Sequence, residues 1–186
     1  FTDEEQLDFA QRFDGTLHTQ SSQSVLVKSR LGTEALSDIS NVGPNGEILP
    51  PNDRRRMGSL ANRLWHTDAS FVDPPGRYSL LSARVLPEVS PDTEFACMRA
   101  AYDDLPDETK QKMEGLVVEH SLVYSRGTVT DNALTPAMKA ELPGAWQTMV
   151  RTNPVNGRKA IYAGAHASHV IGWPRDEGRA FIGSLN

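Results

Sequence analysis

The apolar residues of this chain occur in short runs, and this feature limits the possible folds more than any other. The longest runs, such as "YSLLSARVL" at residues 78–86, have the length of a β-strand. None approaches the roughly 20 residues that a membrane-spanning helix needs, so we expect no membrane insertion. The chain also contains 14 glycines and 12 prolines, which interrupt regular elements. We therefore predict a fold built from short strands and short helices.

Helical and strand patterns alternate along the sequence. Thr2 precedes three acidic residues and then apolar residues at helical spacing, which predicts a helix over residues 2–13. Asn156 and Gly157 lie between two strand-like arms, which predicts a hairpin over residues 148–163. Further helices are predicted at residues 98–105, 106–116 and 174–185, further strands at 24–28, 78–86, 92–98 and 116–126, and a long loop at 40–59. In this prediction strands outnumber helices, and the fold class is α+β.

Charge and cysteine content exclude several classes of protein. The chain carries 19 Lys and Arg against 24 Asp and Glu, a net charge of −5, which argues against nucleic acid as a partner. Cys97 is the only cysteine, so an internal disulfide and a zinc site with several thiolates are excluded, and the cytosol is the expected compartment. The first residues lack the features of a secretion signal and an initiating methionine, so we expect the chain to begin inside a longer protein.

One pair of residues can carry metal chemistry. His66 and Asp68 in "NRLWHTDASF" are separated by one residue, and on a strand such residues point to the same face. An imidazole nitrogen and a carboxylate oxygen would then supply two corners of the 2-His-1-carboxylate triad of non-haem Fe(II) oxygenases. The alternative is an exposed histidine beside a loop aspartate. The neighbouring Trp65 and Phe71 favour a pocket. Motifs of serine hydrolases, phosphate-binding loops and zinc proteases are not found in the sequence.

Four longer segments extend this observation: "NRLWHTDASF", "YSLLSARVLPEVSPDTEFACMRAAYDDLP", "GLVVEHSLVYSR" and "NPVNGRKAIYAGAHASHVIGWPRDEGRAF". The residues of these segments and their order along the chain resemble the TauD/TfdA family of Fe(II)- and 2-oxoglutarate-dependent dioxygenases. The chain looks most similar to the 2,4-dichlorophenoxyacetate branch, chiefly through "DTEFACMRAAYD" and "GAHASHV". The resemblance implies a double-stranded β-helix (jelly-roll) core with flanking helices, in a single domain that residues 1–186 contain incompletely.

Matched residue by residue, the family pattern implies a cofactor site. His66 and Asp68 match the two proximal Fe(II) ligands, and Thr93 in "DTEF" matches a threonine that hydrogen-bonds 2-oxoglutarate. The implied reaction converts 2-oxoglutarate and O2 to succinate and CO2 while a second substrate is hydroxylated. The family's distal histidine ligand and the arginine that anchors 2-oxoglutarate come from a later segment that this sequence does not contain. The chain is therefore either a fragment of a complete enzyme, lacking the C-terminal part of the fold, or a truncated relative that acts as a non-catalytic binding or interaction module.

The implied substrate is a small organic anion. Asn62 matches a position that lines the substrate site, and the loop with His166 and His169 lies near the substrate in the family. These three side chains offer hydrogen-bond donors to an anionic head group. The sequence leaves aryloxyalkanoates, sulfonates and amino acids open as substrates. Because relatives commonly assemble, we expect a homo-oligomer, with neither nucleic acid nor a membrane as partner.

Overall fold

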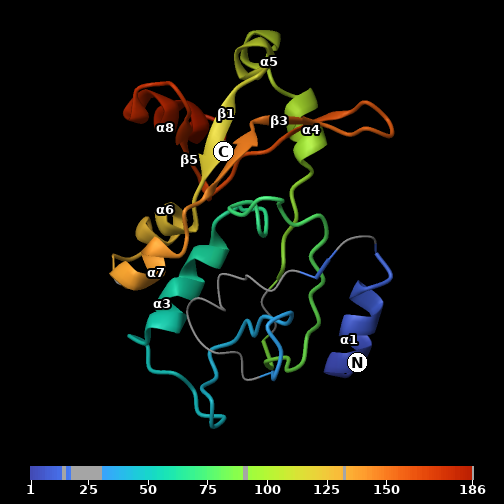
Figure 1. Cartoon of the computed structure of the whole chain (residues 1–186), viewed down its shortest axis with the longest axis vertical. Coiled ribbons are helices and arrows are strands. Elements are labelled where there is room, and N and C mark those ends of the chain that lie inside the picture. Colours follow the sequence, from blue (N-terminus) through green and yellow to red (C-terminus); the bar gives the residue numbers. More distant parts are fainter. Residues whose placement is uncertain (14–15, 18–30, 90–91, 132, 186) are drawn as a thin grey trace.

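A computed structural model describes residues 1–13, 16–17, 31–89, 92–131 and 133–185. Irregular chain with short helices forms the part before residue 98, and the sheets lie in the part after it (Figure 1). The helices are α1 (Asp3–Ala10), α3 (Arg54–Ser59), the 3-10 helix η1 (Leu60–Arg63), α4 (Met98–Asp103), α5 (Asp107–Met113), α6 (Leu122–Gly127), α7 (Pro136–Ala140) and α8 (Arg175–Gly183). The strands are β1 (Val117–His120), β2 (Ala145–Thr148), β3 (Val150–Thr152), β4 (Lys159–Ile161) and β5 (Ala167–Val170).

Two antiparallel sheets organise the second part of the chain. In the three-stranded sheet the order is β2-β1-β5, and Val118 of the central strand pairs with Gln147 on one side and Val170 on the other. The second sheet is the β3-β4 hairpin. The hairpin predicted over residues 148–163 is therefore confirmed. Gly157 in its turn has a φ of +70°, a conformation that glycine adopts without strain.

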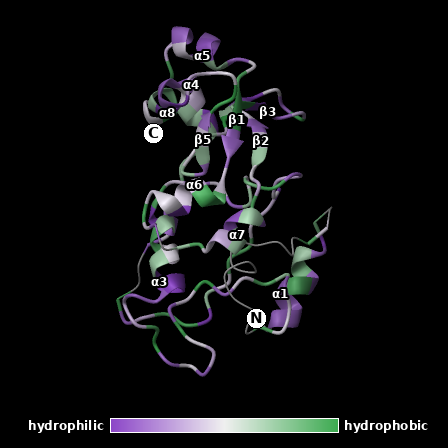
Figure 2. Ribbon diagram, turned by 60° about the vertical axis from the view of Figure 1, so that its left-hand side comes forward, coloured by the Kyte–Doolittle hydropathy of each residue, from purple (hydrophilic) through white to green (hydrophobic). Residues whose placement is uncertain are grey.

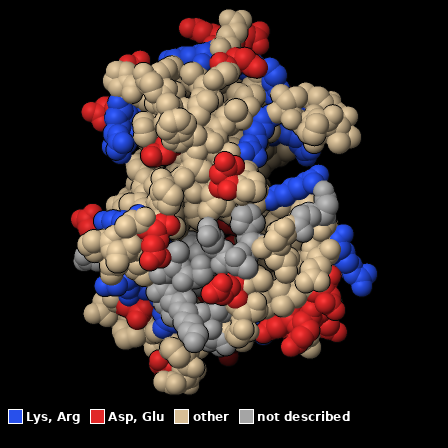
Figure 3. All heavy atoms as spheres, in the orientation of Figure 1, with Lys and Arg blue, Asp and Glu red and all other residues tan. Residues whose placement is uncertain are grey.

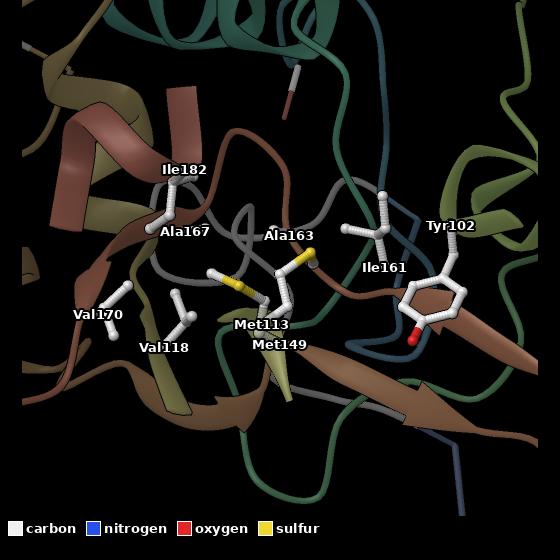
Figure 4. Close-up of a cluster of buried hydrophobic side chains, with 9 residues drawn as sticks. All are labelled: Tyr102, Met113, Val118, Met149, Ile161, Ala163, Ala167, Val170 and Ile182. Carbon is white, nitrogen blue, oxygen red and sulfur yellow. The ribbon is translucent and has the colours of Figure 1, made fainter. Parts of the chain in front are cut away.

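The hydrophobic core lies where α4 and α8 cover the sheets. α4 packs against β4, and α8 packs against β5. Gly178 of α8 allows this close approach, because a Cβ atom there would lie only 2.7 Å from the backbone nitrogen of Val170. Figure 4 shows the buried cluster, which consists of Tyr102, Met113, Val118, Met149, Ile161, Ala163, Ala167, Val170 and Ile182.

The N-terminal helix α1 confirms the helix predicted at the start of the chain. Thr2 Oγ1 accepts a hydrogen bond from Glu5 N (3.2 Å), and the Glu5 carboxylate accepts one from Thr2 N (2.9 Å), which together form a capping box. Arg84 holds the helix to the later chain by donating to the Phe1 carbonyl (2.6 Å) and to Gln6 Oε1 (2.8 Å). The acidic residues of α1 form a patch on the surface (Figure 3).

Two of the predicted strands are wrong. Residues 78–86 and 92–98 are irregular, apart from the start of α4 at Met98. Within the described residues no strand pairs with either segment, and an unpaired strand leaves its backbone groups without partners. Val85 is accordingly 87% exposed and Phe95 is 90% exposed. An apolar run of strand length therefore did not become a strand here.

The predicted strand over residues 116–126 is correct only in its first half. β1 ends at His120, and the chain then turns into α6. Ser121 causes the change, because its Oγ accepts a hydrogen bond from Tyr124 N (3.2 Å) and so caps the helix. The cap residue overrides the strand propensity of the apolar residues that follow it.

Helices are also more numerous than predicted. α3 forms inside the predicted loop at residues 40–59, with Asp53 Oδ1 accepting a hydrogen bond from Arg55 N (2.9 Å) at its start. The other predicted helices are confirmed as α4, α5 and α8. The described ranges contain seven α-helices and five strands, so the prediction that strands outnumber helices is wrong. The strand predicted at residues 24–28 lies outside the described residues.

Apolar and polar residues are mixed along the chain, without one long hydrophobic segment (Figure 2). In the part of the chain that the structure describes, no helix has both the length and the apolar character needed to cross a bilayer. The hydrophobic residues instead serve the core between the sheets and the helices.

Candidate metal and substrate site

His66 and Asp68 lie just after η1, and their side chains converge. His66 Nε2 lies 3.3 Å from an Asp68 carboxylate oxygen. His66 Nδ1 lies 2.7 Å from the Leu64 carbonyl oxygen. Because a carbonyl oxygen only accepts, Nδ1 carries the hydrogen in that contact, and Nε2 is the atom that faces the carboxylate. Two ligand bonds of about 2.1 Å can bridge the pair, so these donors fit a shared divalent cation.

The local structure behind this convergence differs from the predicted one. Neither residue lies in a strand, and Asp68 begins a turn. In that turn Ala69 has a φ of +52°, in the left-handed region that residues other than glycine seldom adopt. The predicted convergence is confirmed, but a turn produces it. The role of the pair in binding a metal stays a prediction.

Hydrogen bonds control the protonation of the pair. The hydrogen bond from His66 is the main cause that lowers the pKa of Asp68 to about 2, and Ser79 Oγ also donates to this carboxylate (2.6 Å). The same hydrogen bond to Asp68 raises the pKa of His66. Because metal ligands must be deprotonated, a divalent cation at this pair would compete with a proton for His66 Nε2.

A second loop supports His66 from the sheet side of the molecule. Ala165 N donates a hydrogen bond to the Trp65 carbonyl (2.8 Å). Gly164 makes this approach possible, because a Cβ atom there would lie 3.1 Å from the Trp65 carbonyl oxygen and 3.4 Å from His66 Cα. The ring centroid of His166 lies 5.8 Å from that of His66. The loop that was predicted to lie near the substrate thus contacts the predicted metal ligand.

His166 is buried and neutral at the candidate site. Burial, followed by the nearby charge of His66, lowers the pKa of His166 to about 3. Its Nδ1 lies 2.8 Å from Ser125 Oγ, and that hydroxyl donates to the Leu122 carbonyl (3.1 Å). Since the hydroxyl hydrogen is used there, Nδ1 donates to Ser125, and Nε2 is left as an acceptor. In this arrangement His166 Nε2 is an acceptor, whereas the sequence analysis expected a donor, and the contact of His166 with a substrate stays a prediction.

Two predicted site residues are not brought to the pair by any described contact. His169 lies on β5, where its Nδ1 is 3.3 Å from a Glu119 carboxylate oxygen and 2.8 Å from Ser168 Oγ. Glu119 alternates with His120 along β1, so the contact between His169 and Glu119 lies on the opposite sheet face from His120. Thr93 is exposed in the irregular segment before α4. Its predicted contact with 2-oxoglutarate stays a prediction.

Asn62 is joined to a residue that the sequence analysis missed. Both terminal nitrogens of Arg126 lie 3.2 Å from Asn62 Oδ1, and Nη1 also donates to the Gly58 carbonyl. Arg126 is only 6% exposed. It escaped notice because the segment 116–126 was predicted to be a strand, whereas α6 turns the side chain toward η1. Its burial is visible only in the folded chain.

The described residues supply two metal donors and no complete set. Among residues 1–13, 16–17, 31–89, 92–131 and 133–185, no group of three or more His, Cys, Asp or Glu side chains is placed to hold a metal ion. His120, although buried, is occupied by Ser70 Oγ at Nδ1 (2.9 Å) and by the Tyr162 carbonyl at Nε2 (3.2 Å). Among the described residues, the pair His66 and Asp68 is thus the candidate for part of a metal centre.

A family model and curated relatives agree with the resemblance found in the sequence. The family model "Taurine catabolism dioxygenase TauD, TfdA family" matches residues 1–186. The alpha-ketoglutarate-dependent 2,4-dichlorophenoxyacetate dioxygenase of Burkholderia sp. (strain RASC) is 43% identical over 157 residues, which cover 84% of this chain and 53% of that protein. The enzyme of the same name from Cupriavidus pinatubonensis is 44% identical over 157 residues, covering 84% and 55%. The chain spans about half the length of these curated relatives.

A solved structure extends the similarity to the fold. The crystal structure of AAD-2 in complex with Mn(II) and N-oxalylglycine is similar with a TM-score of 0.85 and 42% sequence identity, over 100% of this chain and 63% of that one. The helices and antiparallel sheets described above are therefore arranged as in that protein.

Proposed function

We propose that this chain, which belongs to the TauD/TfdA family, carries the His–Asp half of an Fe(II) centre in a 2-oxoglutarate-dependent dioxygenase. The observation that carries this proposal is the 3.3 Å separation between His66 Nε2 and the Asp68 carboxylate. A nitrogen and an oxygen donor at this distance match two corners of the 2-His-1-carboxylate triad. The AAD-2 complex supports the proposal, because N-oxalylglycine differs from 2-oxoglutarate only by an NH in place of a methylene.

Fe(II) and 2-oxoglutarate, when bound, supply the oxidation of a substrate C–H bond by O2, with release of succinate and CO2. The protein's own residues prepare for this. The Leu64 carbonyl holds the His66 ring in the tautomer that offers Nε2, and Ser79 orients the Asp68 carboxylate. Thr93 is proposed to hydrogen-bond a carboxylate of 2-oxoglutarate. The proposal also includes the double-stranded β-helix core, to which the β2-β1-β5 sheet would belong.

The proposed substrate is a small carboxylate with an apolar body, such as an aryloxyalkanoate. The names of the two curated relatives support this class, and sulfonates and amino acids are the other candidates. Phe71 supplies an apolar wall, since its ring centroid lies 4.9 Å from that of His166. Asn62 is the proposed donor to the head group, and His166 is proposed to line the site beside it through its ring, because an anionic head group has no hydrogen to donate to Nε2. His169 is the weaker candidate because Glu119 occupies it.

Succinate release tests the proposed function. The full-length protein is incubated with Fe(II), 2-oxoglutarate and 2,4-dichlorophenoxyacetate, and succinate is quantified for wild type, His66→Ala and Asp68→Ala. We expect substrate-stimulated succinate in wild type and a loss of at least about 100-fold in both variants, because each removes a metal donor. Arg158→Gln, a change at an exposed ion pair with Asp103, is the control. The absence of succinate with every carboxylate and sulfonate tested would favour the non-catalytic binding module instead.

A further inference from the structure

Arg126 is a buried cation that has no counter-charge among the described residues. It is 6% exposed, and in the described part of the chain it forms no ion pair with a carboxylate. Its Nε atom is buried without a hydrogen-bond partner. A charge that is taken out of water without a partner is costly, and such groups are usually paired or functional. The position of Arg126 beside the candidate site points to function.

Arg126 determines which end of the Asn62 side chain is available to a ligand. Both Nη atoms lie 3.2 Å from Asn62 Oδ1. A guanidinium group only donates, so the amide oxygen must face Arg126 and the Nδ2 amino group must face away from it. Asn62 is exposed, and no described group accepts a hydrogen bond from its Nδ2. Arg126 thus fixes the orientation of the Asn62 amide, so that its Nδ2 group is available as a hydrogen-bond donor.

Two short paths connect this pair to the predicted metal ligand. Asn62 lies four residues before His66. On the other side, Ser125 precedes Arg126 and contacts His166, whose ring lies 5.8 Å from the His66 ring. The positive charge of Arg126 also contributes to lowering the pKa of His166, which agrees with its short distance from the site. The oriented donor and the buried cation are therefore joined to the His–Asp pair through Ser125 and His166.

We propose that Arg126 is a positioning residue for substrate recognition: it holds the Asn62 amide with Nδ2 outward and adds the positive potential that attracts a carboxylate head group. Nδ2 of Asn62 makes the direct contact in this arrangement. The inference rests on the proposed function and extends it by naming the residues that select an anion. Because Nε of Arg126 is inaccessible, the arginine acts through Asn62.

The test compares a charged and a neutral ligand of the same shape. The KM and kcat for 2,4-dichlorophenoxyacetate and for its uncharged methyl ester are measured for wild type, Arg126→Gln, Arg126→Lys and Asn62→Ala. We expect Arg126→Gln to raise the KM for the acid by roughly 10- to 150-fold, which is the contribution of a charge-assisted hydrogen bond to affinity. The kcat and the KM for the ester should stay within about twofold of the wild-type values, because the ester carries no charge. Arg126→Lys should restore part of the affinity because it keeps the charge without the paired donors.

A double variant and a matched control sharpen the test. The double variant, Arg126→Gln with Asn62→Ala, should have a KM for the acid within about threefold of the KM of Asn62→Ala alone, because the arginine acts mainly through the amide. Arg158→Gln removes an exposed arginine on the hairpin and should leave every parameter unchanged. Equal losses for acid and ester in Arg126→Gln, with a lower melting temperature, would assign Arg126 to capping the Gly58 carbonyl and overturn the proposal.

Two further outcomes separate this inference from the proposed function. If the KM for 2-oxoglutarate rises instead of the KM for the acid, the carboxylate held is that of 2-oxoglutarate and the proposal is wrong. If wild type releases no succinate, calorimetric titration with 2,4-dichlorophenoxyacetate still decides the matter. In that case, binding of the acid that is roughly 10- to 150-fold weaker in Arg126→Gln than in wild type supports the proposal, and equal binding rejects it.

Discussion

Residues 98–185 bury most of their large apolar side chains, whereas the irregular chain before residue 98 exposes many of its own. Leu122 is 1% exposed and Leu81 is 71% exposed. Val118 and Val85 differ in the same way, at 0% and 87%. The later part thus forms a core of its own, and the earlier part is joined to it by specific contacts, such as the hydrogen bonds that Gln147 Nε2 donates to the Ser70 and Val72 carbonyls.

The candidate site lies where these two parts meet. His66 comes from the irregular part, and His166 comes from the loop before β5. The backbone contact between Ala165 and Trp65 joins them. The sheet part therefore supports the site, while the turn after η1 provides the candidate metal donors His66 and Asp68. Changes in the buried core of residues 98–185 should therefore alter stability, and changes at the contact should alter the site.

The largest expected effect comes from a matched pair of leucines. Leu122→Ala should lower the free energy of unfolding by about 3 to 5 kcal/mol, because it removes a buried side chain and leaves a cavity. Leu81→Ala should change it by no more than about 0.5 kcal/mol, since an exposed side chain loses little on truncation. Urea unfolding of both variants measures the difference. Equal losses would show that the segment with Leu81 is packed, and the contrast between the two parts would fail.

Acid should weaken the sheet part first. His120 is 2% exposed, and burial lowers its pKa from 6.5 to about 4. Between these values the unfolded chain binds a proton that the folded chain does not, so His120 by itself lowers stability by about 3 kcal/mol as the pH falls from about 6.5 to about 4. His166, with its pKa lowered to about 3, adds a further loss over the same range. Asp68, with a pKa lowered to about 2, adds its loss only at lower pH. The free energy of unfolding, measured by urea unfolding at each pH, should fall less steeply with falling pH in His120→Gln than in wild type. An equal slope in the two proteins would show that His120 is not the cause of the loss.

A smaller effect is expected where the two parts touch. Gly164→Ala should lower stability by about 1 to 3 kcal/mol, because the new Cβ presses on the Trp65 carbonyl and on His66. Gly183→Ala is the control, since nothing lies within 4 Å of a Cβ at that position. Thermal unfolding gives the stabilities, and metal affinity shows whether His66 has moved. A Gly164→Ala protein as stable as wild type would mean that the contact does not position the site.

Prediction from sequence succeeded where local signals act alone. The capping residues of α1 and the Asn–Gly turn of the β3-β4 hairpin needed no distant partner. The strands predicted at residues 78–86 and 92–98 failed because a strand depends on a neighbour that local sequence does not contain. At the site, the short spacing of His66 and Asp68 was informative even though a turn produces the geometry. The burial of Arg126 and the neutral state of His166 depend on long-range packing, and the sequence could not indicate either.

The most direct test of the central claim is the binding of Mn(II), followed by electron paramagnetic resonance in the presence of N-oxalylglycine. If His66 and Asp68 are metal ligands, the full-length protein should bind about one Mn(II) per chain, and His66→Ala and Asp68→Ala should each weaken that binding by roughly 10- to 100-fold. Arg158→Gln should bind as wild type does, because its ion pair with Asp103 lies on the exposed hairpin. Stoichiometric binding of undiminished affinity in both site variants would show that the metal is held elsewhere and would contradict the account.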